Sequence, residues 1–234
     1  MTKKLNDRIA LVTGASRGIG AATAEALAAA GAHVVLTART SGGLEEVEER
    51  IHQAGGTATI APLDLLETDA IPKLAMAIAG RWGRLDMLVM NAATLGTLTP
   101  VQDIDAKEFD GLLALNLVAN QRLLASFDKL LRAAPHGRVV ALTSSVGASP
   151  RAYWGAYGAS KAALETLLLS YAEEVRNLVD LRVAIVDPGA TATRMRARAY
   201  PGEDASTLKT PDVVGQAIAR LFETDFDTGF RTRF

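Results

Sequence analysis

Short apolar runs alternate along the chain with longer segments in which apolar residues recur every three or four positions. Apolar runs rich in β-branched residues are typical of buried strands, and the longer spacing is typical of helices that bury one face. The runs that predict strands are RIALVT, HVVLTA, TATIAPL, LDMLVM, GRVVALT and LRVAIV. The segments that predict helices cover residues 20–30, 44–54, 70–82, 105–132, 157–177 and 211–223. Thr210 as N-cap and Pro211 in the first turn mark the start of the last helix.

The predicted strands and helices alternate from one end of the chain to the other. Strands that are almost entirely apolar are buried on both faces, and parallel strands are joined by right-handed helical crossovers. The pattern therefore predicts an α/β fold, a doubly wound parallel sheet with helices on both faces, which is a Rossmann fold. Because no linker, repeat or low-complexity tract divides the sequence, we expect residues 1–234 to form a single domain.

Composition and charge narrow the class of partner. With 49% hydrophobic residues, 22% charged residues and a formal net charge of −1, the chain has no general electrostatic attraction to nucleic acid or to an anionic membrane. We therefore expect a small-molecule partner, no nucleic acid and no membrane. No segment is long and apolar enough to span a bilayer, and the start MTKKLNDRIALV is unlike a signal peptide, so we expect a cytoplasmic protein.

Cysteine and histidine usage restricts the chemistry further. The chain has no cysteine, which excludes disulfides, thiolate catalysis and cysteine-ligated metals. Its three histidines, His33, His52 and His136, are widely separated in the sequence. We therefore expect no metal site.

A glycine-rich segment, TGASRGIGAATAEAL, follows the first predicted strand and runs into the first predicted helix. Gly14, Gly18 and Gly20 let the backbone turn sharply and approach a pyrophosphate, whose charge is stabilised by free N–H groups at the start of the helix. A tight turn without a ligand has the same composition. Because the segment joins a strand to a helix in a β-α-β unit, we favour dinucleotide binding.

The segment YGASKAALETLLLSYAEEV has helical spacing and carries a lysine among apolar residues. Tyr157, Lys161, Leu164, Leu168 and Tyr171 are three or four positions apart and so share one face of the helix. A buried ammonium needs a partner, because removing it from water is costly. Two explanations are open: the lysine reaches water along its aliphatic stem, or it serves a ligand beside the tyrosine.

Further motifs follow in a fixed order: LDL at 63–65, NAA at 91–93, Asn116 within a long helix, SS at 144–145 and PGATAT at 188–193. With the glycine-rich segment and YGASK, they make the chain resemble the short-chain dehydrogenase/reductase family, in its single-domain branch, over essentially its whole length. The segments WGAYGASK and RMRARAYPGED are also similar to YciK-like bacterial oxidoreductases of that family.

The resemblance implies hydride transfer between a nicotinamide and a carbonyl or secondary alcohol carbon, with four catalytic residues. Tyr157 would be the general acid in reduction and the base in oxidation. Lys161 would lower the pKa of that phenol and bind the nicotinamide ribose. Ser144 would hold the substrate oxygen, with Ser145 as the alternative. Asn116 would support a proton-relay water, and a satisfied amide in the core is the alternative for that residue.

The resemblance also implies the set of cofactor-binding residues. The family usually has glycine where this chain has Ala93, a change that adds a methyl group and removes no reactive group. For Thr191 and Thr193 an ordinary hydroxyl-rich loop is the alternative. The full set is Gly14, Ser16, Arg17, Gly18, Ile19, Gly20, Arg39, Asp64, Leu65, Asn91, Ala92, Tyr157, Lys161, Pro188, Gly189, Thr191 and Thr193.

The end of the second predicted strand indicates which nicotinamide is used. Proteins that bind NAD place an acidic residue there, where it contacts the ribose hydroxyls and repels a 2′-phosphate. This chain has Ala38 at that position and Arg39 next to it. Arg17 in the glycine-rich segment adds a second guanidinium, which pairs well with phosphate. We therefore expect NADP(H) as the cofactor, with Thr40 and Ser41 as additional donors.

Other functions and several details stay open. A protein that binds NADP(H) as a sensor or scaffold would not need all four catalytic residues, and an epimerase or dehydratase of the longer branch would need a further substrate domain. Reduction of 3-oxoacyl thioesters is an alternative substrate class. Arg194, Arg196 and Arg198 either recognise an anionic substrate or form a solvated helix face. We expect a homo-oligomer, a dimer or tetramer, although the sequence ends soon after DTG.

Overall fold

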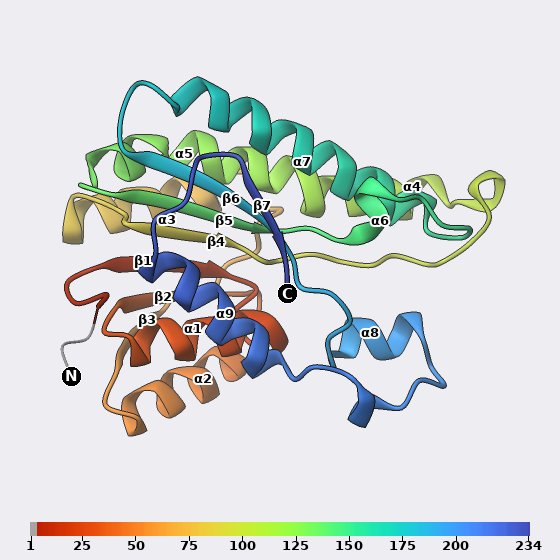
Figure 1. Cartoon of the computed structure of the whole chain (residues 1–234), viewed down its shortest axis with the longest axis horizontal. Coiled ribbons are helices and arrows are strands. Elements are labelled where there is room, and N and C mark those ends of the chain that lie inside the picture. Colours follow the sequence, from red (N-terminus) through yellow and green to blue (C-terminus); the bar gives the residue numbers. More distant parts are fainter. Residues whose placement is uncertain (1–3) are drawn as a thin grey trace.

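The computed structural model describes residues 4–234, which form one parallel sheet with helices packed on both of its faces (Figure 1). The spatial order of the seven strands is β3-β2-β1-β4-β5-β6-β7. All six predicted strands are present. The strands are β1 (Ile9–Thr13), β2 (His33–Thr37), β3 (Thr57–Ile60), β4 (Met87–Met90), β5 (Gly137–Leu142), β6 (Leu181–Asp187) and β7 (Phe230–Arg233).

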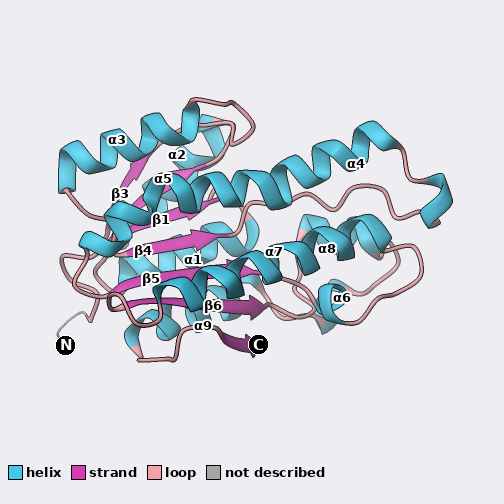
Figure 2. Ribbon diagram, turned by 90° about the horizontal axis from the view of Figure 1, so that it is seen from above, coloured by secondary structure: helices cyan, strands magenta, loops and turns pink. Residues whose placement is uncertain are grey.

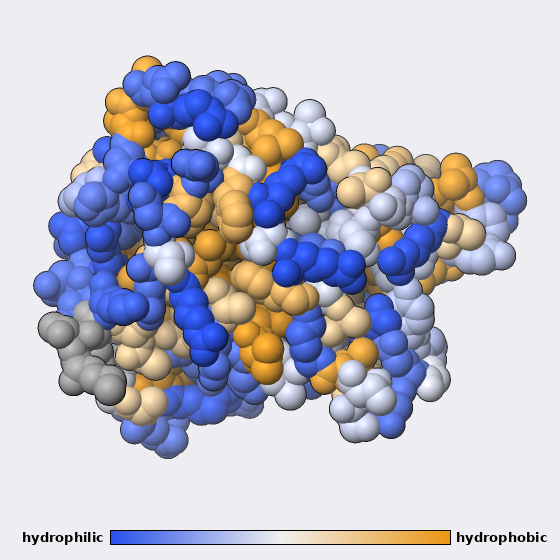
Figure 3. All heavy atoms as spheres, in the orientation of Figure 1, coloured by the Kyte–Doolittle hydropathy of each residue, from blue (hydrophilic) through white to orange (hydrophobic). Residues whose placement is uncertain are grey.

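The last strand, β7, is not predicted by the sequence pattern. In its sequence, FRTR, every second residue is an arginine and most residues are exposed, so it does not form an apolar run. It pairs in parallel with β6 at the edge of the sheet, where charged side chains protect against pairing with other chains. Hydrophilic residues cover much of the surface on the face that carries this edge (Figure 3).

Two layers of helices cover the sheet. Helices α1, α2 and α9 lie on one face, and α3, α5 and α7 lie on the other (Figure 1). None of the helices within residues 4–234 is long and apolar enough to span a bilayer. The helices are α1 (Gly18–Ala29), α2 (Ser41–Gln53), α3 (Ala70–Trp82), α4 (Ala106–Leu113), α5 (Ala119–Ala133), α6 (Ser145–Ala148), α7 (Gly155–Val175), α8 (Arg194–Ala199) and α9 (Pro211–Glu223).

Alternate residues of each strand pack into two separate cores. In β1, Val12 belongs to the core under α1 and α9, whereas Leu11 belongs to the core under α5 and α7. The first core also holds Leu27 of α1 and Ile218 of α9, and the second holds Phe127 of α5. Both faces of the central strands are therefore buried, which explains why these strands have continuous apolar sequences.

The single helix predicted over residues 105–132 is wrong in one respect. A π-helical stretch, Ala114–Val118, separates α4 from α5, and Asn116 lies within it. The apolar spacing continues through this stretch, so periodicity alone does not reveal it. Short π-helical segments inside helices are uncommon and frequently occur at functional sites. Thr210 does occupy the N-cap position of α9, but its side chain makes no capping hydrogen bond.

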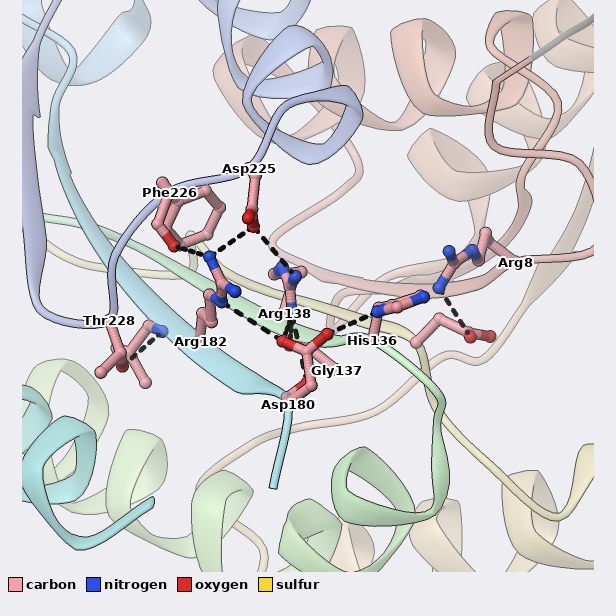
Figure 4. A network of polar contacts seen from close by, with 11 residues as sticks. Arg8, His136, Gly137, Arg138, Asp180, Arg182, Asp225, Phe226 and Thr228 are labelled. Carbon is pink, nitrogen blue, oxygen red and sulfur yellow. Dashed lines mark hydrogen bonds and ion pairs between the residues drawn. The ribbon is translucent and has the colours of Figure 1, made fainter. Parts of the chain in front are cut away.

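A dense network of ion pairs lies at the amino ends of β5 and β6 (Figure 4). The guanidinium of Arg138 contacts Asp180 at 3.0 Å and Asp225 at 3.4 Å. Arg182 contacts the same two carboxylates, at 3.2 Å and 2.5 Å, and His136 approaches Asp180 at 2.5 Å. These charged groups thus satisfy one another and join the two strands to the segment after α9.

Candidate active site

The structure brings the predicted site residues to the carboxyl end of the sheet. The glycine-rich segment follows β1, Arg39 follows β2 and Asp64 follows β3. Asn91 follows β4 and Ser144 follows β5. Helices α4, α6 and α8 lie beyond the same end of the sheet (Figure 2). Because the chain crosses over between β1 and β4, this edge includes the switch point at which ligands bind in doubly wound sheets.

The glycine-rich loop has a backbone that only glycine adopts easily. Gly14 and Gly18 have φ angles of +65° and +56°, in the left-handed region. A Cβ atom on Gly20 would lie 2.3 Å from the Gly14 carbonyl oxygen, so a larger residue does not fit there. The side-chain amide of Asn91 donates to the carbonyls of Thr13 and Gly14, at 2.8 Å and 3.2 Å. Asn91 thus fixes the start of the loop to the end of β4.

The start of α1 is suited to bind phosphate. Arg17 occupies the N-cap position without a side-chain capping bond, and the first turn has no acidic residue. Its N–H groups and the positive end of the helix dipole are therefore available to an anion. Arg17 and Arg39 are both exposed, and Ala38 at the end of β2 is partly exposed. The methyl group of Thr193 lies 3.7 Å from a Cβ built on Gly18, which places the loop after β6 beside the glycine-rich loop.

Lys161 is a buried cation at the inner face of α7. Its side chain is almost fully buried, and Nζ donates to the carbonyl of Leu142, the last residue of β5, at 2.8 Å. Nζ lies 5.7 Å from the centre of the Tyr157 ring. Burial lowers the pKa of Lys161 to about 8, although the nearby carboxylate of Glu165 raises it in part. The lysine therefore does not reach out to water, and its first partner is a strand carbonyl.

Tyr157 is also buried, and its titration differs from the expectation. Burial raises the pKa of the Tyr157 phenol above its usual range, and the negative charge of Asp187 raises it further. The sequence predicts a pKa lowered by Lys161. In the structure, burial and the charge of Asp187 both favour the neutral phenol, so Tyr157 is protonated at neutral pH. A protonated phenol is the form required of a general acid.

Asn116 is fully buried, and its side chain has protein partners. Its Oδ1 accepts from the Thr94 amide, and its Nδ2 donates to the Thr94 carbonyl, both at 2.9 Å. Nδ2 also lies 3.1 Å from the hydroxyl of Ser160, which donates to the Tyr157 carbonyl. The Asn116 carbonyl accepts from Asn120 at 2.8 Å. This amide therefore connects the loop after β4 to the start of α7.

Ser144 and its neighbours have different partners at the end of β5. Ser144 occupies the N-cap position of α6, but its hydroxyl makes no capping bond there. The hydroxyl of Ser145 accepts a long hydrogen bond of 3.4 Å from Arg151. The hydroxyl of Thr143 donates to the carboxylate of Glu165. Of the two serines, the geometry favours Ser144 as the one whose hydroxyl is available to a substrate.

The loop after β6 has structural roles for both of its threonines. Gly189 has a φ angle of +66°, which favours glycine. Thr191 is buried, and its hydroxyl donates to the Pro188 carbonyl at 3.2 Å. The hydroxyl of Thr193 caps α8 by accepting from the Arg196 amide at 3.1 Å. These bonds agree with the interpretation of 188–193 as a hydroxyl-rich loop.

Asp64 and Leu65 lie where β3 leaves the sheet. The carboxylate of Asp64 accepts from the Leu66 amide at 3.0 Å, which forms a tight turn. The amide of Leu63 donates to the Ala38 carbonyl at 2.9 Å, so this turn lies beside the end of β2. Leu65 is buried. The turn after β3 and the end of β2, which would both contact the adenosine half of a dinucleotide, are therefore neighbours.

Comparisons with known proteins agree with this geometry. Residues 8–204 match the sequence profile of the short chain dehydrogenase family. The chain is 40% identical over 210 residues to YciK, an uncharacterised oxidoreductase of Escherichia coli K12, which covers 88% of this chain and 82% of YciK. This chain belongs to the short-chain dehydrogenase family.

Solved structures of family members have the same fold. The E. coli YciK structure superposes with a TM-score of 0.94 at 36% identity, over 100% of this chain and 97% of that one. A short-chain dehydrogenase of E. coli CFT073, complexed with NADPH, has a TM-score of 0.94 at 37% identity, over 100% and 98% of the two chains. A Shigella flexneri relative, complexed with NADP, has a TM-score of 0.95 at 36% identity, over 100% and 99%.

Two buried residues of this short-chain dehydrogenase site are absent from the sequence-based predictions. Thr13 accepts from the amides of Asn91 and Ala92, at 3.0 Å and 3.1 Å, and donates to a β4 carbonyl. Glu165 lies one helical turn after Lys161 and is buried. Its position beside the apolar stripe of α7 is the same signal that singles out the lysine.

The three arginines of α8 do not behave alike. Arg196 forms two hydrogen bonds of 2.5 Å with the carboxylate of Glu203, and its guanidinium lies 3.7 Å from the centre of the Tyr200 ring. Arg194 and Arg198 are exposed. The charge of Arg196 is thus already neutralised by Glu203, whereas Arg194 and Arg198 form a solvated face.

Two surface cavities lie outside the predicted site. One, of about 450 Å³, lies between the end of β3 and α3 and is lined by residues that include Pro62, Thr68 and Lys73. The other, of about 260 Å³, lies against the ion-pair network at the amino ends of β5 and β6. Neither is lined by a residue of the predicted catalytic or cofactor-binding sets.

Proposed function

We propose that this short-chain dehydrogenase transfers a hydride between NADP(H) and a carbonyl or secondary alcohol carbon. The observation that supports this most strongly is that the Lys161 ammonium lies beside the Tyr157 ring and donates to the strand that ends just before Ser144. Tyr157 and Lys161 come from one face of α7, and Ser144 comes from the end of β5. The Lys161 ammonium donates a hydrogen bond to the carbonyl of Leu142, which lies two positions before Ser144.

The residues at the carboxyl edge fit a dinucleotide with a 2′-phosphate. The uncapped start of α1 would hold the phosphates. Arg17 and Arg39 would hold the 2′-phosphate, and no acidic side chain at Ala38 would repel it. Asp64 would lie at the adenine, and Asn91 supports the loop beneath the cofactor. Related structures complexed with NADP and NADPH support this assignment.

The remaining cofactor contacts are proposed on the nicotinamide side. Bound NADPH supplies the hydride. The Lys161 ammonium would bind the ribose, and Ala92 would border it. The loop after β6 would border the carboxamide and the phosphates through Pro188, Gly189, Thr191 and Thr193, while Ser16, Ile19 and Leu65 complete the set.

The chain's own residues handle the proton. Ser144 would donate to the substrate oxygen and orient it toward Tyr157. Tyr157, which burial keeps protonated, would donate its phenolic proton to that oxygen during reduction. The ammonium of Lys161 would then stabilise the phenolate, because an opposite charge nearby favours the ionised form. Asn116 would hold the start of α7 in place and support the return of the proton.

A non-catalytic sensor or scaffold that binds NADP(H) is the alternative function. It would not require a buried lysine next to a buried tyrosine, since unpaired buried charge is costly. Reduction of 3-oxoacyl thioesters is the alternative substrate class. An Acinetobacter relative is called a fatty acyl-CoA reductase; it is 36% identical over 74% of this chain and 59% of its own length.

Cofactor preference provides a direct test of the proposed function. NADPH and NADH are titrated into the purified protein, and binding is followed by tryptophan fluorescence. We expect NADPH to bind at least about tenfold more tightly, because each charge-assisted phosphate contact contributes more than 1 kcal/mol. Ala38→Asp and Arg39→Ala should each reduce this preference. Arg50→Ala is the matched control, because Arg50 is an exposed arginine paired with Glu25 on α1.

The control should leave the preference for NADPH unchanged. Equal or tighter binding of NADH by the unmodified protein would refute the cofactor assignment. Binding of both cofactors without turnover of any aldehyde, ketone or alcohol would favour the sensor alternative.

A further inference from the structure

Apolar and aromatic side chains pack around Tyr157. Leu95 and Val146 are buried against it, and four partly exposed residues pack on this cluster. We call the set the apolar rim. It consists of Leu95, Leu98, Val146, Trp154, Met195 and Ala199.

The apolar rim is assembled from four separate segments. Its residues come from the loop after β4, from α6, from the residue before α7 and from α8. Trp154 lies edge-on to Tyr157, with ring centres 6.0 Å apart, and 5.8 Å from the ring of Tyr200. Large apolar residues that remain half exposed in one place are typical of binding surfaces. Because the residues of the apolar rim converge on Tyr157, the proposed general acid, we expect this surface to receive the substrate.

The three arginines of α8 either lie on a different face of the helix from the residues of the apolar rim or are paired with a carboxylate. Met195 and Ala199 are four residues apart and pack on the apolar rim. Arg194 and Arg198 have the same spacing on an adjacent face of the helix, and both are exposed. The third, Arg196, is paired with Glu203 and stacked on an aromatic ring.

We infer that the substrate of this site is an aldehyde or ketone whose carbonyl carries an uncharged aryl or alkyl group. This inference rests on the proposed function of Tyr157. The group would lie against Trp154 and Met195, where burial of apolar surface favours binding. A carboxylate on the same group would lose its hydration without gaining a free cation.

A matched pair of substrates tests this inference. Reduction of 4-methylbenzaldehyde and 4-carboxybenzaldehyde by NADPH is measured for the unmodified protein, Trp154→Ala, Trp154→Phe and Tyr153→Asn. We expect kcat/KM to be at least about tenfold higher for the methyl compound. Trp154→Ala should raise the KM for 4-methylbenzaldehyde about tenfold. Trp154→Phe should have a KM close to that of the unmodified protein. Tyr153→Asn is the control, since Tyr153 is exposed and has positive φ, which asparagine tolerates.

A binding measurement separates this inference from the proposed function. In a Trp82→Phe background, Trp154 is the remaining tryptophan, so its fluorescence reports ligands at the apolar rim. We expect 4-methylbenzyl alcohol, but not 4-carboxybenzyl alcohol, to change that fluorescence. Equal or better binding and turnover of the carboxylate would overturn the inference. Selective binding of the methyl alcohol without turnover of either aldehyde would instead refute the proposed function and leave the apolar site.

A second inference comes from the buried carboxylate of Glu165. Oε1 accepts a hydrogen bond from the hydroxyl of Thr143, and Oε2 lies 2.9 Å from the guanidinium of Arg231 in β7. Its side chain is only 9% exposed, so this is a desolvated charge with a defined set of partners. Glu165 thus joins the residue before Ser144, the helix that carries Lys161, and the edge strand.

We propose that Glu165 is a positioning residue that keeps Lys161 charged and holds the end of β5 in place. This proposal rests on the assigned role of Lys161. The charged groups that face Glu165 are Lys161 on its own helix and Arg231 on β7, and Tyr157 also faces the lysine. A negative charge one turn from the ammonium stabilises its protonated form.

The test replaces the charge while retaining the hydrogen-bonding shape. Glu165→Gln is compared with Glu173→Gln, an exposed glutamate of the same helix paired with Arg176. The titration of the Lys161 ε-carbon is followed by ¹³C NMR without cofactor. From its value of about 8, we expect the pKa of Lys161 to fall by about one unit in Glu165→Gln and to stay unchanged in Glu173→Gln.

The pH profile of reduction gives a second readout. Loss of the charge should move the alkaline limb of kcat to lower pH by a similar amount, with KM for substrate little changed, and Glu165→Asp should restore it in part. A lower kcat with the Lys161 titration and the alkaline limb both unmoved would show a merely structural role and overturn the proposal. A shifted Lys161 titration in a protein without turnover would instead count against the proposed function.

Discussion

The two ends of the sheet use charged residues in opposite ways. At the amino end, Arg138 and Arg182 are paired with Asp180 and Asp225 in a closed network (Figure 4). At the carboxyl end, Lys161 has a strand carbonyl as its hydrogen-bond partner and lies beside a buried phenol. The closed cluster of ion pairs therefore joins structural elements, and the carboxyl end has the perturbed groups typical of an active site.

The difference has a physical cause. A carboxylate that receives hydrogen bonds from arginines is stabilised in its ordinary charged form. A buried group without a full counter-charge shifts toward its neutral form, as Tyr157 and Lys161 do. Substitutions at the amino end should accordingly change stability, whereas substitutions at the carboxyl end should change chemistry.

The largest effect is expected for Tyr157→Phe. Phenylalanine packs as tyrosine does but has no transferable proton. We expect kcat to fall by about 10⁴-fold, with NADPH affinity and the free energy of unfolding nearly unchanged. Stopped-flow reduction and denaturant unfolding check this, and undiminished reduction by the variant would exclude Tyr157 as the acid.

Asp86→Ala should have the largest effect at the opposite end. Asp86 is fully buried, accepts from the Ile9 amide at 2.9 Å and pairs with Arg84 at 3.1 Å. We expect the free energy of unfolding to fall by about 3 kcal/mol, because the buried Ile9 amide and the partly exposed Arg84 lose their acceptor. Activity per folded molecule should be retained. The exposed Asp110→Ala is the control, and a selective loss of kcat in Asp86→Ala would contradict the comparison.

Lys161→Ala should lower kcat by about 10²-fold and also weaken NADPH binding, since two roles are assigned to one ammonium. Steady-state kinetics and cofactor titration measure the two effects separately. A loss of rate with unchanged cofactor affinity would disprove the ribose contact and leave the charge effect on Tyr157.

The smallest effect is expected for Asp180→Asn. Burial raises the pKa of Asp180, but hydrogen bonds from His136 and Arg138 lower it more, so its net value lies below the ordinary 3.8. Its ionised form therefore stabilises the fold above about pH 4. This contribution disappears as the pH falls through the lower pKa that Asp180 has in the folded state.

Because Asp180 is partly exposed and screened by solvent, we expect Asp180→Asn to lower the free energy of unfolding by at most about 1 kcal/mol at pH 7. The difference from the unmodified protein should shrink in acid. Unfolding curves between pH 3 and 7 check this, and a difference that grows in acid would contradict the sign.

Most of the fold could be predicted because burial on both faces leaves a clear mark on a strand. β7 could not, because a polar edge strand such as Phe230–Arg233 has no apolar run. The π-helical stretch at Asn116 was also hidden, since apolar spacing continues through it. Such features depend on partners distant in the sequence.

The gathering of the site could be predicted from motifs at strand ends, but the state of its groups could not. The spacing of Tyr157 and Lys161 indicates a shared face, yet the raised pKa of the phenol follows from the depth of its burial. Likewise, the partners of Glu165 are Thr143, which follows β5 and lies 22 positions before it, and Arg231 of β7, near the end of the chain.

The central claim is that the carboxyl end of the sheet transfers hydride with Tyr157 as the proton donor. The most direct test incubates NADPH that carries deuterium at both C4 positions with 4-methylbenzaldehyde and follows the label in the product alcohol by mass spectrometry. We expect one deuterium in each alcohol molecule formed by the unmodified protein, and almost no labelled alcohol formed by Tyr157→Phe in the same time. Alcohol without deuterium, or an equal yield of labelled alcohol from the two proteins, would contradict the claim.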